Sequence, residues 1–160
     1  MTKNVVLGIG NILLSDEGVG VRVVEALAAA GDWPGEVELI DGGTCGMEML
    51  DQLEGLDLLV VVDCVRGGRA PGTPVVLRGD AVPKFFRTKL SPHQIGLADV
   101  LASLELTGRA PGETVIVGIE PESLALGMEL TPAVAARLPE LVDLTQAELA
   151  RHGLRPGVPA

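Results

Sequence analysis

Two carboxylates and one imidazole stand at comparable points of the chain, where an apolar run gives way to a loop or a helix. Glu17 follows the first apolar run, Asp63 ends a later one, and His93 lies in a segment that opens a helix. If these runs are parallel strands, the three residues share the edge of the sheet at which ligands bind. Two carboxylates and an imidazole that meet there would form a divalent-metal site with open positions, suited to Ni²⁺ or Zn²⁺.

Each of these residues also has a structural interpretation. Glu17 would complement the dipole of a first helical turn, and Asp63 would accept hydrogen bonds from loop amides. The functional interpretation is favoured for Asp63, because an acid at the end of a buried strand is costly unless it is paired or ligated. His93 is a candidate ligand because Glu17 and Asp63 occupy matching positions in the predicted fold. His152 lies near the chain end and is taken as incidental.

Short apolar runs alternate with helical patterns along the chain. We predict strands over residues 4–9, 37–40, 56–62, 73–77 and 114–119. We predict helices to about residue 30, with Ser15 or Asp16 as the N-cap, over 46–53 and 91–106, and over 131–150, with Thr131 as the N-cap. This alternation predicts an α/β fold, a three-layer α/β/α sandwich with a mainly parallel, twisted sheet of about five strands. We expect one domain over residues 1–152 and a flexible C-terminal tail over 153–160.

Composition narrows the classes of partner. The formal net charge of −10 argues against nucleic acid and against an anionic membrane surface. There is no apolar run of the roughly 20 residues that cross a membrane, and the start does not resemble a signal peptide. We therefore expect a soluble, cytoplasmic monomer. Cys45 and Cys64 are too few for a disulfide framework and are expected to be reduced and buried.

A dinucleotide-binding interpretation of Gly8-Ile9-Gly10 is weaker. Leu13 stands where the third glycine of that fingerprint belongs. Asp16 and Glu17 would also lie at the helix N-terminus, where they would repel a phosphate. A nucleotide-binding α/β module is thus a minor alternative.

Asp41 ends the second predicted strand at the same edge. Gly42 and Gly43 follow it, so its structural interpretation is an Asx-type turn. Its place beside the other three residues also makes it a candidate functional carboxylate.

Five segments, in a fixed order, carry a more specific signal. They are residues 8–21 (GIGNILLSDEGVGV), 41–44 (DGGT), 62–63 (VD), 91–97 (SPHQIGL) and 117–124 (VGIEPESL). Together they resemble the [NiFe]-hydrogenase maturation proteases, and the resemblance extends over most of residues 5–144. It implies an endopeptidase that removes a C-terminal extension from the hydrogenase large-subunit precursor after nickel has been inserted.

The resemblance also implies roles for residues. Glu17, Asp63 and His93 match the metal-contacting set, and Asp41 matches an acidic residue tied to substrate recognition or catalysis. The nickel would be carried by the substrate, and Zn²⁺ or Cd²⁺ could replace it in a crystal. Cys64 departs from the family pattern, in which alanine is expected; its thiol either joins the metal site or is a buried bystander.

Two mechanisms fit these residues, and the sequence does not separate them. The substrate's nickel, gripped by Glu17, Asp63 and His93, could act as a Lewis acid. Alternatively, Asp41 or Asp63 could activate water as a general base. A non-catalytic nickel-binding chaperone would use the same ligands.

Phe85 and Phe86 are the only phenylalanines, and they lie among basic residues shortly before His93. One interpretation is that one of the two packs in the core beside solvated charges. A contact surface for the precursor is the sharper hypothesis.

Overall fold

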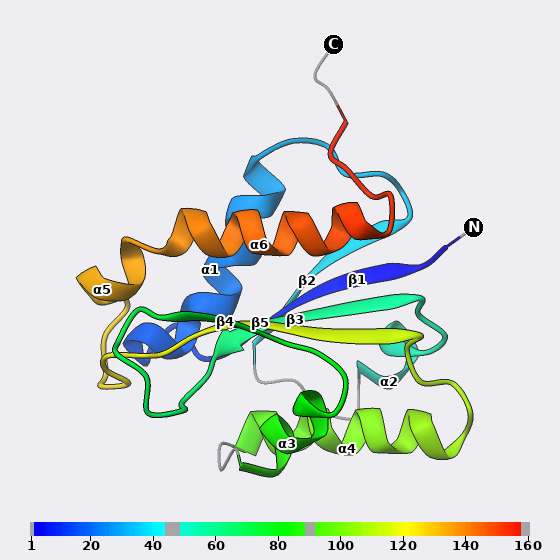
Figure 1. Cartoon of the computed structure of the whole chain (residues 1–160), viewed down its shortest axis with the longest axis horizontal. Helices are drawn as coiled ribbons and strands as arrows, with labels where there is room; N and C mark the ends of the chain where they lie inside the picture. Colours follow the sequence, from blue (N-terminus) through cyan, green and yellow to red (C-terminus); the bar gives the residue numbers. More distant parts are fainter. Residues whose placement is uncertain (1, 44–48, 89–91, 158–160) are drawn as a thin grey trace.

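The computed structural model describes residues 2–43, 49–88 and 92–157, with the backbone alone described for 85–88 and 92–96. One five-stranded sheet has the order β2-β1-β3-β5-β4 (Figure 1). The strands are β1 (Asn4–Ile9), β2 (Val37–Gly43), β3 (Leu58–Cys64), β4 (Pro74–Leu77) and β5 (Glu113–Ile119). All neighbours pair in parallel except β4, which is antiparallel to β5. The prediction of a mainly parallel α/β fold is confirmed.

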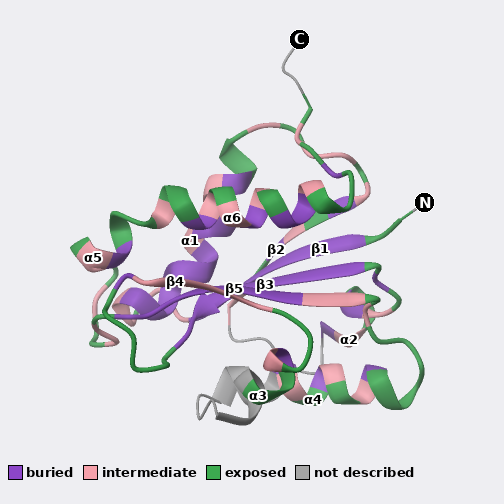
Figure 2. Cartoon of the chain, in the orientation of Figure 1, coloured by how far each residue is buried: buried purple, intermediate pink, exposed green. Residues whose placement is uncertain are grey.

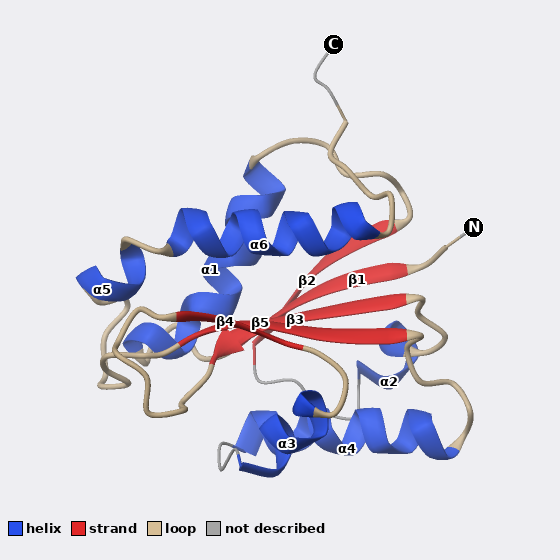
Figure 3. Ribbon diagram, viewed as in Figure 1, coloured by secondary structure: helices blue, strands red, loops and turns tan. Residues whose placement is uncertain are grey.

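Helices cover both faces of this sheet (Figure 3). The 3₁₀ turn η1 (Ser15–Gly18) leads into α1 (Val19–Ala29), which shares one face with α5 (Pro132–Ala135) and α6 (Leu138–Arg151). The opposite face carries α2 (Leu50–Leu53), α3 (Ala81–Thr88) and α4 (Pro92–Leu106). None of the helices in the described part of the chain has the length and apolar character needed to cross a membrane.

The central strands are buried on both sides, as Figure 2 shows. Alternate residues of β3 enter different layers of the core: Leu59 and Val61 pack with α4, whereas Val60 and Val62 pack with α1 and α6. Burial on both faces explains why β3 reads as an unbroken aliphatic run rather than an alternating one.

Several elements differ from their predicted form. β3 runs to Cys64, so Asp63 lies inside the strand and not just after it. The helix predicted over 131–150 is two helices, because Pro139 cannot donate an N–H inside a helix and instead occupies the first turn of α6. Helix α3 was not predicted.

Part of the predicted tail packs on the domain. Leu154 is buried in the same core layer as α1 and α6. The Gly157 N–H donates to the carbonyl oxygen of Asp32 at 2.6 Å. The chain therefore stays in contact with the domain beyond the end of α6.

Glycines allow α1 to lie directly against the sheet. A Cβ at Gly20 would lie 2.5 Å from the Ile9 carbonyl oxygen and even closer to the Val62 carbonyl oxygen. A Cβ at Gly8 would come similarly close to the Gly20 carbonyl oxygen. Gly10 has a φ of +129°, and a Cβ there would overlap the backbone of Glu17. The glycines of the Gly8-Ile9-Gly10 segment thus serve backbone packing, which brings η1 to the carboxyl ends of β1 and β3.

This packing predicts that Gly20→Ala is destabilising. Alanine normally favours a helix interior over glycine by about 1 kcal/mol. Here the added Cβ meets backbone atoms that cannot rotate away, and we expect a loss of about 3 kcal/mol in the free energy of unfolding. Chemical denaturation checks this, with Gly35→Ala as the control because no atom lies within 4 Å of that Cβ. A neutral or stabilising Gly20→Ala would contradict the backbone contact.

Candidate active site and metal centre

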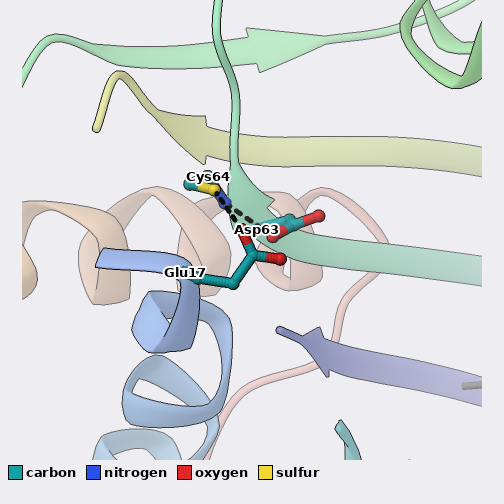
Figure 4. Close-up of side chains that lie close together, drawn as sticks. All are labelled: Glu17, Asp63 and Cys64. Atoms are coloured by element: carbon teal, nitrogen blue, oxygen red, sulfur yellow. Dashed lines mark hydrogen bonds between the residues drawn. The ribbon is translucent and has the colours of Figure 1, made fainter. Parts of the chain in front are cut away.

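Glu17 and Asp63 meet at the carboxyl edge of the sheet, together with Cys64 (Figure 4). One potential ligand atom from each residue lies within 4.8 Å of the other two. All three residues are buried: Glu17 is 4% exposed, Asp63 0% and Cys64 1%. The cluster therefore joins two carboxylates and a thiol in a place sheltered from bulk water.

The backbone explains how neighbours on one strand can serve one site. Successive side chains of a strand point to opposite faces, but Asp63 and Cys64 are the last two residues of β3. The Asp63 Oδ1 accepts a hydrogen bond of 2.8 Å from the Cys64 amide, so its carboxylate turns along the strand end. The Cys64 thiol donates to Glu17 Oε2 at 3.4 Å. Glu17, on η1 just before α1, thus contacts the end of β3 and completes the cluster.

This donor set suits a borderline ion. Carboxylate oxygens alone would suit Mg²⁺ or Ca²⁺, but a thiol beside them favours Zn²⁺, Ni²⁺ or Cd²⁺. His93 lies in the first turn of α4. Its side chain is outside the described residues, so its place in the ligand set stays a prediction.

Asp41 occupies a different position. It lies in β2 opposite Gly8, and its side chain is exposed. Its Oδ1 accepts a 3.0 Å hydrogen bond from the Gly43 amide, which is the Asx-type turn that its structural interpretation predicted. Among residues 2–43, 49–84 and 97–157 the second oxygen of this carboxylate accepts no hydrogen bond, and a catalytic role stays a prediction.

Two other sequence features fall outside the description. The side chains of Phe85 and Phe86 are not among the described residues, although their backbone belongs to α3. Cys45 lies in the undescribed segment 44–48. The predictions for these residues are not tested.

Asp16 is a buried anchor that the sequence analysis did not identify. Its Oδ2 accepts from the amides of Glu122 and Ser123 at 2.9 and 3.1 Å, and its Oδ1 accepts from the Thr131 amide at 2.8 Å. The Thr131 hydroxyl contacts the same carboxylate. The expectation that Ser15 or Asp16 caps the following helix is therefore wrong, and Thr131 does not cap α5 by its side chain.

Glu120 is a second buried carboxylate missed in the sequence. It is 7% exposed, and its Oε2 accepts a 2.8 Å hydrogen bond from the Gly67 amide and lies 3.8 Å from the Arg69 guanidinium. Because Gly67 follows β3 by three residues, Glu120 holds the loop that leaves the site.

The second histidine lies away from the site. His152 Nε2 is 3.5 Å from Glu113 at the amino end of β5. Burial alone would raise the pKa of the Glu113 carboxyl, but hydrogen bonds from His152 and Arg151 and the charge on Arg151 lower it below its usual value. His152 thus belongs to a surface ion-pair group at the opposite edge of the sheet.

Comparison with known proteins gives a consistent result. A family model described as hydrogenase maturation protease matches residues 21–148. The hydrogenase 2 maturation protease of Escherichia coli is 46% identical over 150 residues, which are 93% of this chain and 92% of that protein. HupD of Rhodobacter capsulatus, a hydrogenase expression/formation protein, is 44% identical over 92% of this chain and 69% of its own length. The solved structure of the E. coli hydrogenase maturating endopeptidase HybD matches with a TM-score of 0.93 and 45% identity over 96% of both chains.

The fold and these similarities together show that the chain is a peptidase. More particularly, the chain belongs to the hydrogenase maturation proteases.

The Asp16 anchor predicts that Asp16→Asn is strongly destabilising. An amide has one acceptor oxygen instead of two and turns an N–H₂ toward backbone N–H donors, so we expect a loss of about 2–4 kcal/mol in the free energy of unfolding. Asp80→Asn is the control, because Asp80 is exposed. Equal denaturation midpoints for the two variants would show that the Asp16 contacts add nothing to stability.

Proposed function

We propose that this protease removes the C-terminal extension from a [NiFe]-hydrogenase large-subunit precursor after nickel insertion, and that it acts as a nickel-dependent, monomeric endopeptidase. The observation that carries this proposal is the convergence of the buried Glu17 and Asp63 carboxylates at the carboxyl edge of the sheet. Family membership supports the same reaction class.

In this proposal the nickel arrives with the precursor and is part of the substrate. Glu17 and Asp63 hold it, with His93 as the imidazole ligand and Cys64 as an added thiolate ligand. When bound, the ion would polarise the scissile carbonyl as a Lewis acid. Precursors without nickel would lack the group that these side chains bind, so cleavage would follow insertion.

Two carboxylates are candidates for the group that activates water. Asp41 is exposed at the edge strand, and Gly43 leaves room beside it for a peptide backbone, because the nearest atom to a Cβ there is the Asp41 Oδ1 at 3.8 Å. Asp63 lies inside the cluster and would have to combine ligation with proton transfer. The exposed position favours Asp41 as the general base.

The direct test is incubation of the protein with nickel-loaded and nickel-free large-subunit precursor, followed by intact-mass measurement. We expect loss of one C-terminal peptide from the loaded precursor only. Stable binding without mass loss would identify a nickel-binding chaperone instead. Equal cleavage of both precursors would rule out nickel dependence.

The ligand set predicts an optical signature. Titration of the protein with Ni²⁺ or Cd²⁺ should produce a thiolate-to-metal charge-transfer band in the near ultraviolet, which Cys64→Ser removes. Glu17→Gln and His93→Ala should each weaken binding of the ion at least about tenfold. Glu25→Gln is the control, because Glu25 is exposed on α1. Ion binding by the wild-type protein without that band would make Cys64 a bystander.

If Asp41 is the general base, Asp41→Asn should retain metal affinity but lose most of its cleavage activity, since a carboxamide cannot accept the proton of water. Both quantities are measured on the same preparation. Full activity would leave Asp63, or the ion alone, as the activating group. Joint loss of metal and activity would make Asp41 a ligand or a residue that orients one.

A further inference from the structure

Large apolar side chains are concentrated beside the site. Among the described residues, four such side chains are exposed: Leu13 (49%), Leu126 (86%), Met128 (62%) and Leu106 (90%). The first three belong to two loops, the one between β1 and η1 and the one between β5 and α5. We call Leu13, Leu126 and Met128 the apolar rim.

The two loops are joined into one surface. The Gly127 amide donates to the Leu13 carbonyl and the Ser15 amide donates to the Gly127 carbonyl, each at 2.8 Å. This is a parallel bridge between Leu14 and Gly127, so Leu13 lies beside Leu126 in register. Leu126 and Met128 flank Gly127, so each residue of the apolar rim is a chain neighbour of this bridge.

Side chains reinforce the junction. The Ser15 hydroxyl donates to the Ala125 carbonyl at 2.6 Å, and the Arg22 guanidinium donates to the Met128 carbonyl at 3.1 Å. The buried Asp16 carboxylate fixes both ends of the second loop through Ser123 and Thr131. The apolar rim is therefore held in place before any partner binds, which reduces the entropy lost on association.

The apolar rim lies a short stretch of chain away from the site. Leu13 precedes Glu17 by four residues, and four residues of chain span at most about 14 Å. Four or five residues of an extended peptide would cover that distance. A polypeptide with its scissile bond at Glu17 and Asp63 therefore has the apolar rim within reach of its flanking residues.

The charge beside the apolar rim is predominantly negative. Glu122 and Glu129 are exposed on the second loop. Arg22, whose guanidinium donates to the Met128 carbonyl, also pairs with Glu25 at 3.4 Å. A complementary segment carries large apolar side chains and neighbouring lysine or arginine.

We propose that the apolar rim binds an apolar, basic-flanked segment of the precursor polypeptide, four or five residues from the bond that is cut. This inference rests on the proposed function, because it names how the same substrate is gripped. The apolar rim would supply affinity for the polypeptide, while Glu17 and Asp63 bind the metal.

The test uses the double variant Leu126→Ser/Met128→Ser, with Leu106→Ser as matched control. Leu106 is the most exposed of the four, and it ends α4 near the amino ends of the strands, away from the site. We expect the double variant to raise KM for nickel-loaded precursor about tenfold with kcat within twofold, because apolar burial in the complex is lost. Leu106→Ser should match the wild type, and both variants should keep the wild-type Tm and Ni²⁺ affinity.

Precursor binding, measured by surface plasmon resonance without reference to cleavage, separates this inference from the proposed function. Cleavage by the wild type with unchanged KM and Kd in the double variant overturns the docking role alone. An equal effect of Leu106→Ser overturns it as well. Wild-type binding without cleavage refutes the peptidase function, and weaker binding by the double variant would then still support the apolar rim as the docking surface.

Discussion

The first turn of α1 lies against β1 and β3 backbone to backbone, with no side chain between them, and the geometry of the site depends on this contact. Only glycine at positions 8 and 20 permits the approach, because a Cβ at either would overlap carbonyl oxygens of the facing segment. The approach brings η1 to the end of β3. Glu17 reaches Asp63 and Cys64 for that reason, and the Cys64 amide and thiol each donate a hydrogen bond to one of the two buried carboxylates.

A second constraint acts on the loops around this contact. The Asp16 carboxylate fixes the loop between β5 and α5, and Ser15 adopts a φ of +53°, a backbone conformation that costs energy for a residue with a Cβ. The Ser15 hydrogen bonds to Ala125 and Gly127 hold it there. The two neighbouring acids thus have different roles: Asp16 holds the loop between β5 and α5, and Glu17 faces the site.

The sequence was sufficient for the fold and for the meeting of Glu17 with Asp63, because parallel strands bring their carboxyl ends to one edge. The structural role of Asp16 could not be predicted from the sequence. Its partners lie 106 to 115 residues away, and they include backbone amides, which every residue type except proline carries. The break between α5 and α6 could have been read from Pro139. Cys64 was noted as a departure from the family pattern, but its contact with Glu17 required the structure, since neighbouring strand residues point to opposite faces.

The proposed reaction depends on one point in space, where the carboxylates of Glu17 and Asp63 would share an ion. Anomalous diffraction from crystals grown with Ni²⁺ locates that ion directly. We expect a single strong peak about 2.0–2.3 Å from a carboxylate oxygen of each residue, with the His93 ring nitrogen and the Cys64 sulfur as further ligands. A peak bound elsewhere, or a Glu17 or Asp63 side chain turned away from the ion, would contradict this expectation.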